Sequence, residues 1–319
     1  MKLIPMPART VLAMAVVVCS RLVFPAPAVA EMPVVTDVRA ESLGGAVTAI
    51  AKQSGALAWN PAGLSAMPQV ELGALYASGI VDTQYMGVSC GIPLGIGGLA
   101  IGWHRMANEF EKTSALDVPI GDGTVSNDVV RAGIGVNILP VKLGVAVRYV
   151  AERIDDFSLD GFACDAGAQY AWRKLRLGAA WKNAYAGGLT GTGAAGDAVS
   201  ETMPPSVRAG VALVLPASFD VQQRKQNMED GSAGPRRRTL TITPTVDVDI
   251  PVYRRQTLQA TPGIELDVER LVALRLGLHE CRDVRAGIAL KTPAFVIDYA
   301  FAANTDLAHT HILSTTIYF

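Results

Sequence analysis

Long apolar runs are scarce in this sequence, and so is charge. Beyond residues 1–30 no stretch of about eighteen apolar residues occurs, so no membrane-spanning helix is expected there. Only 18% of the 319 residues are charged, and the formal net charge of -1 argues against a nucleic-acid partner. Half of the residues are nevertheless apolar, and the 31 glycines are numerous. The apolar residues must therefore be spread over short segments, which suits a transmembrane β-barrel.

Cysteine and histidine are too few to indicate reactive chemistry. Cys90, Cys164 and Cys281 are widely spaced and match neither a disulfide framework nor a metal-binding motif. His311 and Ser314 would lie on opposite faces of a strand, so they form no catalytic pair. We therefore predict no catalytic residue, no metal site, no cofactor and no enzymatic activity.

A glycine-rich stretch imitates a dinucleotide-binding motif. Gly191, Gly193 and Gly196 have the spacing of that motif, but the required strand before it and helix after it are missing. We interpret the stretch as part of an external loop.

Residues 1–30 have the pattern of a secretory signal peptide. Lys2 and Arg9 supply positive charge, an apolar stretch follows, and Ala28–Ala30 is a small-x-small cleavage site. The apolar stretch is too short to span a bilayer as an anchor. We therefore expect the protein to be exported.

From about residue 70 onward, apolar residues alternate with small or charged ones, which is the period of a β-strand. In 240–250, for example, Leu, Ile, Pro and Val alternate with Thr and Asp. About fourteen such segments occur, an even number as a closed antiparallel barrel requires. They lie near 70–79, 83–92, 96–106, 127–139, 142–153, 161–172, 174–184, 206–216, 238–250, 256–267, 270–279, 282–291, 294–302 and 310–319.

The two faces of these segments differ in a way that favours a membrane barrel over a soluble sandwich. The second face carries glycines, alanines and isolated charges, which fit a crowded polar lumen better than a surface in water. These charges would either form a carboxylate-binding path or a paired network that fills the barrel, and we favour the network. The predicted lumen charges are Arg131, Arg148, Arg208, Asp247, Glu265, Arg275, Arg285 and Asp298.

The connections between the segments alternate in length. Those near Gly95, Pro140 and Arg173 are tight, whereas 107–126 and 185–205 are long. Short periplasmic turns and longer external loops are typical of outer-membrane barrels. The connection 217–237 is an exception, because it is long but falls on the side of the tight turns.

Between the signal peptide and the first strand, residues 31–68 do not alternate. Ala46, Val47, Ala49 and Ile50 would share one side of a short helix, and Asn60 before Pro61 favours a turn. The segment resembles the start of the PorV/PorQ-like outer-membrane proteins, which belong with the FadL-type transporters of hydrophobic compounds. The matching residues are Gly44, Gly45, Ala46, Thr48, Ala49, Trp59, Asn60, Pro61, Ala62 and Gly63.

The resemblance implies an all-β fold. It predicts a closed, antiparallel, transmembrane β-barrel of about fourteen strands (residues 69–319) with a small N-terminal helical or irregular hatch (residues 31–68). Gly44, Gly45 and Trp59–Gly63 would form the hatch, which either moves on ligand binding or is a fixed plug. The expected location is a Gram-negative outer membrane, with lipid and the barrel-assembly machinery as partners.

Two functions remain open at this point. The first is passive uptake of hydrophobic, fatty-acid-like molecules, and it predicts an apolar pocket between hatch and wall. The alternative is a PorV-like secretion accessory or structural scaffold that binds a secreted protein, and it predicts a filled lumen.

The last segment ends on Phe319, which we expect to act as an assembly signal in the final strand. Replacing Phe319 with Asp should impair membrane assembly, because a charge would enter the strand that closes the barrel. Heat-modifiable migration on gels measures the folded fraction. A Phe319→Tyr control should assemble normally, and equal folding of the Asp variant would contradict the prediction.

Overall fold

The computed structural model describes residues 34–113, 118–138, 140–193, 196–221, 236–251, 258–303 and 309–319. The predicted signal peptide at residues 1–30 lies outside these ranges.

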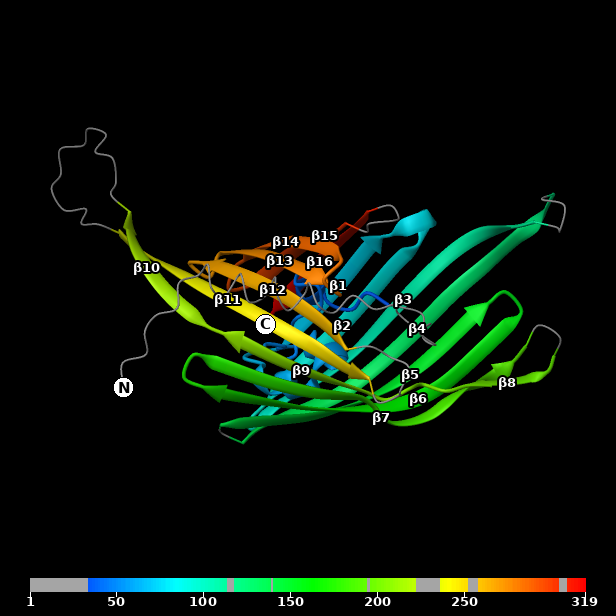
Figure 1. Cartoon of the computed structure of the whole chain (residues 1–319), viewed down its shortest axis with the longest axis horizontal. Coiled ribbons are helices and arrows are strands. Elements are labelled where there is room, and N and C mark those ends of the chain that lie inside the picture. Colours follow the sequence, from blue (N-terminus) through cyan, green and yellow to red (C-terminus); the bar gives the residue numbers. More distant parts are fainter. Residues whose placement is uncertain are drawn as a thin grey trace.

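The described residues form one antiparallel sheet in which strands adjacent in the chain pair with each other, except around β8, β9 and β10 (Figure 1). The bounds are β1 Glu71–Ser78, β2 Gln84–Leu94, β3 Gly97–Thr113, β4 Pro119–Ile138, β5 Val141–Ile154, β6 Phe157–Trp172, β7 Leu175–Thr192, β8 Ala198–Glu201, β9 Ser206–Leu213, β10 Leu215–Val221, β11 Arg236–Pro251, β12 Gln259–Val268, β13 Val272–His279, β14 Asp283–Lys291, β15 Phe295–Ala302 and β16 Thr310–Tyr318.

The sheet closes on itself. β16 pairs with β1, which places Tyr318 opposite Glu71 and His311 opposite Ser78. β9 pairs with β7 on one side and with β11 on the other. β8, β9 and β10 together occupy one place in the ring, between β7 and β11: β8 pairs with β7, and β10 pairs with β11. Counted as one, they make the described segments a closed barrel of 14 strands. The fold predicted from the alternating pattern is confirmed.

Exposure alternates along the wall strands. In β4, Val130 and Ile134 are each 38% exposed, whereas Arg131 between them is 6% exposed. In β11, Thr245 and Asp247 are each 1% exposed. Apolar rows therefore face outward, and small or charged side chains face the lumen, as expected for a barrel in hydrocarbon.

Two stretches predicted as long loops are largely strands. β3 continues to Thr113 and β4 begins at Pro119, so most of 107–126 is a hairpin that projects from one end of the barrel (Figure 1). β7 likewise continues to Thr192 and includes Gly191 of the glycine-rich stretch. Polar residues occupy both faces of these extensions, so the alternation that reveals a strand against hydrocarbon is absent there.

β10 ends and β11 begins at the opposite end of the barrel from the β3–β4 hairpin. Antiparallel strands reverse direction at each connection, so this end is also that of the tight turns that precede β3, β5 and β7 (Figure 1). Residues 222–235, between β10 and β11, are outside the described ranges.

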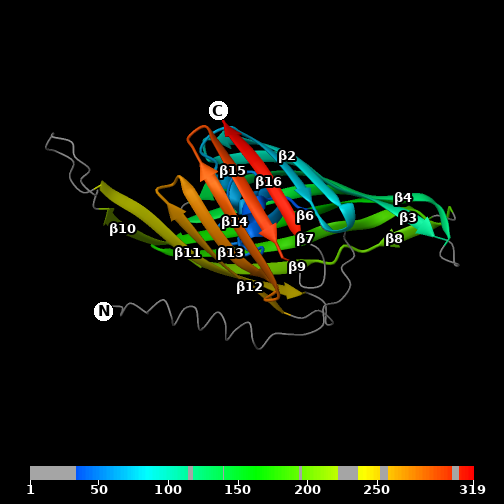
Figure 2. The ribbon, with the colours of Figure 1, turned by 90° about the horizontal axis from the view of Figure 1, so that it is seen from above.

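Residues 34–70, which we call the N-terminal segment, lie inside the barrel (Figure 2). The segment contains the helices α2 (Val38–Ser42) and α3 (Ala56–Trp59) and the 3₁₀ helix η1 (Pro61–Ala66). A further 3₁₀ helix, η2 (Ile80–Asp82), joins β1 to β2. No helix among the described residues has both the length and the apolarity needed to span a membrane.

The helix predicted around residues 46–50 is wrong, because the chain forms turns there. Helix α2 ends earlier, where Gly44 and Gly45 adopt positive φ angles of 69° and 96°. Beyond them the Thr48 N–H donates to the wall residue Asp247 at 2.8 Å, not to a helical carbonyl. Contact with the barrel therefore overrides local helix propensity.

A ring of glycines on the inner wall makes room for the N-terminal segment. A Cβ atom at Gly144 would lie 2.3 Å from the Pro61 carbonyl, and one at Gly167 would lie 2.0 Å from Asn60 Oδ1. Ten strands contribute such a position, and at each of them a larger residue would push a side chain into the N-terminal segment. The glycines in contact with the segment include Gly91, Gly98, Gly135, Gly144, Gly167, Gly178, Gly210, Gly263, Gly277 and Gly287.

We predict that Gly144→Ala displaces the N-terminal segment. The added methyl group would overlap backbone atoms of Pro61 and Ala62, and overpacking of this kind typically costs about 1–3 kcal/mol. Limited proteolysis should cleave the segment faster, and the barrel should unfold at a lower temperature on heat-modifiability gels. Gly95→Ala is the matched control, because nothing lies within 4 Å of its Cβ position. Equal protection in both variants would contradict a tight fit.

Candidate functional site: the lumen and the N-terminal segment

Asn60 joins the N-terminal segment to the wall. Its side-chain amide donates to the Thr48 carbonyl at 2.8 Å and to the Ala168 carbonyl of β6 at 3.1 Å. Its Oδ1 accepts from the Ala62 N–H at 3.1 Å, which caps η1 where Pro61 begins the helix. The side chain is fully buried, and each of its polar atoms has a partner. Asn60 thus fixes the turn and the position of the segment together.

Two cations of the wall lie close to the Trp59 ring. Lys182 Nζ lies 5.1 Å from the ring centroid, and the Arg208 guanidinium carbon lies 5.0 Å from it. These distances allow cation–π attraction on the indole. Gly45 also lies close, because its Cβ position is 3.0 Å from the Trp59 ring. The sequence-predicted residues Gly45 and Trp59 are thus brought together, whereas Gly44 packs against the β13 backbone.

Arg39 of α2 is the centre of a buried ion network. It holds Glu265 through two bonds, from Nε at 2.9 Å and from Nη2 at 3.1 Å, and its Nη1 donates to the Ile50 carbonyl at 3.0 Å. Arg275 donates to the same Glu265 at 2.8 Å and to Asp298 at 2.5 Å. Burial lowers the pKa of Arg39, but the Glu265 carboxylate outweighs it and raises that pKa overall.

The other predicted lumen charges fall into separate groups. Arg285 lies 3.6 Å from Glu41 of the N-terminal segment. Arg208 donates to Asp249 at 2.7 Å, near Asp247 and its bond to Thr48. Arg131 and Arg148 lie opposite each other on β4 and β5, and Arg148 donates to Asn183. The eight charges therefore do not converge on one ligand site; most of them hold the segment or each other.

An apolar compartment lies in the lumen against the inner face of β4, β5, β6 and β7. It is formed by Val129, Val150, Leu159, Ala163, Leu189 and Met203, all nearly inaccessible, and Val34 of the N-terminal segment packs against it. The compartment is filled by these side chains. The apolar pocket that transport predicts between segment and wall is thus occupied by the protein itself.

The wall beside this compartment is interrupted. The β6–β7 register shifts twice, between Gly161 and Ala163 and again between Cys164 and Ala166. On its other edge, β7 pairs with β9 only as far as Lys182 and with β8 only from Leu189 onward. Residues 183–188 of β7 therefore lack a ladder partner on that edge. The least regular part of the barrel lies next to its most apolar interior.

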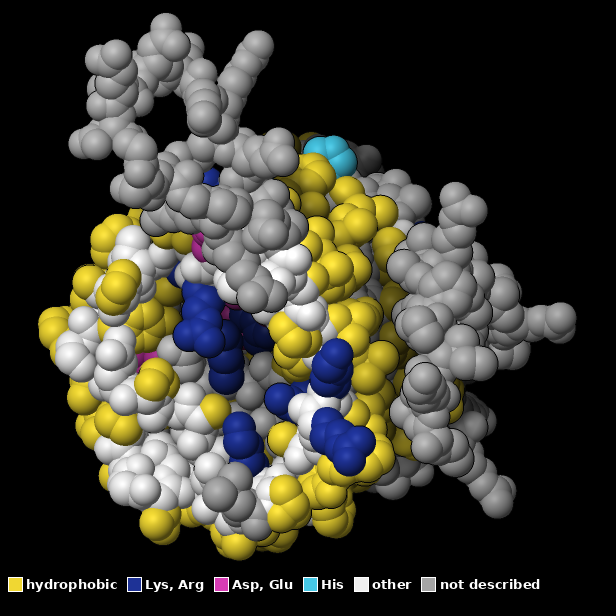
Figure 3. All heavy atoms as spheres, turned by 90° about the vertical axis from the view of Figure 1, so that its left-hand side faces the viewer, with side chains coloured by type: hydrophobic (Ala, Val, Ile, Leu, Met, Phe, Trp, Pro, Cys, Tyr) yellow, Lys and Arg dark blue, Asp and Glu magenta, His cyan; other side chains and the backbone are white. Residues whose placement is uncertain are grey.

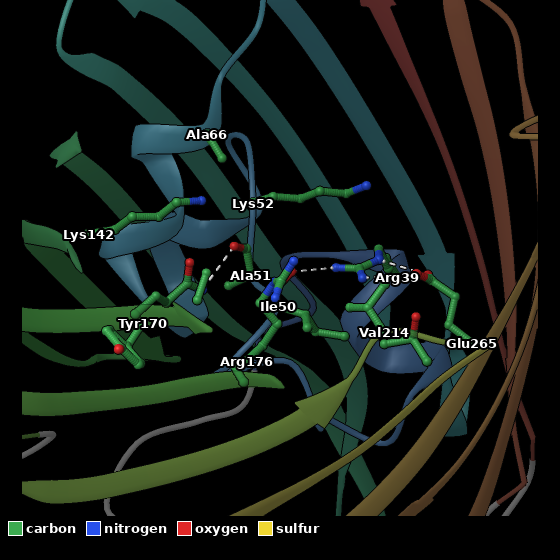
Figure 4. A pocket seen from close by; sticks show the side chains of 14 residues that line it. Arg39, Ile50, Ala51, Lys52, Ala66, Lys142, Tyr170, Arg176, Val214 and Glu265 are labelled. Carbon is green, nitrogen blue, oxygen red and sulfur yellow. Dashed lines mark hydrogen bonds and ion pairs between the residues drawn. The ribbon is translucent and has the colours of Figure 1, made fainter. Parts of the chain in front are cut away.

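A cavity of about 250 Å³ opens at the tight-turn end, between the N-terminal segment and the wall (Figure 4). Basic side chains gather in the hollow of this end (Figure 3). The charged residues that line the cavity are Arg39, Lys52, Lys142, Arg176 and Glu265.

Sequence reasoning missed the residues of the N-terminal segment that carry charge. Arg39, Glu41 and Lys52 precede the first strand, so strand periodicity says nothing about them. The available signal was the unusual presence of charges in an otherwise apolar segment that must lie within the barrel.

Comparison with known proteins supports the fold. No family model matches the chain, and no curated protein matches it either. The toluene transporter TodX of Pseudomonas putida superposes with a TM-score of 0.54 at 13% identity, over 88% of this chain and 97% of that one. A FadL homologue of Pseudomonas aeruginosa superposes with a TM-score of 0.52 at 10% identity, over 90% and 99%. The monoaromatic hydrocarbon channel CymD gives 0.50 at 12%, over 88% and 96%. The chain has the barrel fold of these channels.

We predict that Arg39→Gln loosens the N-terminal segment. Removing one partner of a buried ion pair typically costs about 3–5 kcal/mol, and the two side chains are only 12% and 9% exposed. Faster proteolysis within residues 34–70 and a lower unfolding temperature should follow. Arg105→Gln is the control, because the Arg105–Asp128 pair is longer, at 3.5 Å, and more exposed. Similar losses in both variants would mean that Arg39 does not anchor the segment.

Proposed function

We propose that the chain is an outer-membrane channel for passive passage of hydrophobic small molecules, with the N-terminal segment as its hatch. The outward apolar rows suit a bilayer, and the barrel fold is shared with the transporter and channels named above. A fatty-acid-like ligand and the PorV/PorQ resemblance belong to this proposal as predictions from the sequence.

The observation that carries the proposal is the apolar compartment next to the interrupted wall. Transfer of a hydrophobic solute from water into an apolar compartment lowers its free energy. The solute can pass to the bilayer most easily where the hydrogen-bond ladder between the strands is incomplete. Leu189 and Ala163 belong to the compartment and to the strands that border the interruption. Because the compartment is filled, passage requires the segment to shift; Val34 is the part of the segment that packs there.

A second candidate function is a scaffold for a secreted protein, and the projecting β3–β4 hairpin favours it. β3 has 17 residues and β4 has 20, whereas about 9–11 residues cross a bilayer. The hairpin exposes Phe110, Val118 and Ile120 near its tip. The filled apolar compartment supports this function, which predicts a filled lumen.

Uptake of a hydrophobic fluorophore by intact Gram-negative cells tests the transport proposal. Cells that produce the protein should take up N-phenylnaphthylamine faster than cells that do not. Leu189→Gln should slow uptake several-fold by placing an amide in the apolar compartment, whereas Leu189→Met should preserve it. Equal uptake with and without the protein would favour the scaffold. Heat-modifiability gels ensure that both variants are folded.

A further inference from the structure

Two strands continue beyond the barrel wall at the tight-turn end. β10, residues 215–221, pairs with residues 236–242 of β11, and we call this pair the β10–β11 ribbon. The neighbouring strands end near its base: β7 begins at Leu175, opposite the last residue of β9, and β12 pairs with β11 no further than Leu240. The ribbon therefore projects past the turns on both sides of it (Figures 1 and 2).

The ribbon has an open edge along β10. β10 is the last strand in the order of the sheet, and no strand among the described residues pairs with it on the side away from β11. The backbone at its base faces the β6–β7 turn, because the Val214 N–H donates to the Lys174 carbonyl at 2.8 Å. A ribbon of only two strands is marginally stable in water, so a third strand along this edge would stabilise it.

The sequence of β10 limits where a third strand can pair. Pro216 has no amide hydrogen, so it cannot donate to a neighbouring strand. The available edge is residues 217–221, which span roughly 17 Å at the rise of a β-strand. A short extended segment of another protein would cover that length.

The ribbon is basic. Residues 236–238 are three consecutive arginines, and the paired residues of β10 include one acid, Asp220. Arg238 lies 3.6 Å from Glu269, and the two side chains are 43% and 33% exposed, so this pair neutralises the ribbon only weakly.

The end of the barrel that carries the ribbon is basic as well. Arg173 and Lys174 in the β6–β7 turn and Arg270 in the β12–β13 turn are exposed. Basic side chains are also visible across this end in the space-filling view (Figure 3). An acidic partner would therefore be attracted to this end and would approach the ribbon favourably.

We propose that the open edge of β10 binds an extended, acidic segment of a protein partner by β-strand addition. Main-chain hydrogen bonds to residues 217–221 would supply affinity, and carboxylates near residues 236–238 would supply specificity. A second copy of this chain fits the edge less well, because two arginine-rich ribbons would repel each other. The inference does not depend on transport, since the ribbon lies outside the barrel wall.

Fluorescence anisotropy tests the proposal with three labelled peptides of about six residues, long enough to cover the open edge. The first alternates glutamate with threonine, the second alternates lysine with threonine, and the third is the acidic peptide with every backbone amide N-methylated. The purified full-length protein in neutral detergent should bind the acidic peptide and not the basic one. N-methylation should weaken binding at least about tenfold, because the peptide can no longer donate main-chain hydrogen bonds.

The variant Arg236→Gln/Arg237→Gln should weaken binding of the acidic peptide about fivefold or more, because two of the three ribbon arginines are lost while the Arg238–Glu269 pair is kept. Arg236→Lys/Arg237→Lys should retain most of the binding. Arg173→Gln/Lys174→Gln is the matched control, since it removes two exposed cations from the same end but not from the ribbon. It should bind more tightly than the ribbon variant, and heat-modifiability gels verify that each variant is folded.

Three results would overturn the proposal. The first is that the acidic peptide does not bind the wild type. The second is that the N-methylated peptide binds as tightly as its parent, which would mean that charge alone attracts it. The third is that the ribbon variant binds like the wild type. Sedimentation velocity adds a further check: a dimer that excess acidic peptide leaves intact and that occupies the edge would also contradict the proposal.

Discussion

The rest of the structure depends on the closed backbone ladder. In hydrocarbon every exposed N–H and C=O group needs a partner, and a sheet supplies all of them only when its first and last strands meet. Here β16 meets β1 over the whole of β1, and β9 joins β7 to β11. Once the ring is closed, strand pleating assigns each residue to the outer face of the barrel or to the lumen. The apolar rows and the polar interior follow from that single constraint.

A closed barrel of this size leaves an interior that must be filled, and the N-terminal segment fills it by backbone contact. Gly144 and Gly167 allow Pro61 and Asn60 to approach the wall more closely than any side chain would permit. Glycine weakens a strand, so these positions reduce wall stability in return for fit. The segment is thus matched to this barrel by shape as well as by charge.

The interior charges divide into those that hold the structure and those left over. Glu265, Arg275 and Asp298 form a network completed by Arg39, so they act as anchors for the segment. Lys142 and Arg176, by contrast, line the cavity at the tight-turn end.

The sequence alone predicted the closed barrel and most of its strand segments, because a period of two is local and survives without knowledge of the fold. It failed at the helix expected around Ala46–Ile50 and at the extensions of β3, β4 and β7, where contact with the wall or with water replaces the pattern. Only the tertiary structure decided that Arg39 meets Glu265, 226 residues away, and that Lys52 and Lys142 line the same cavity. Such pairings depend on how the strands are staggered around the closed ring, which no local spacing records.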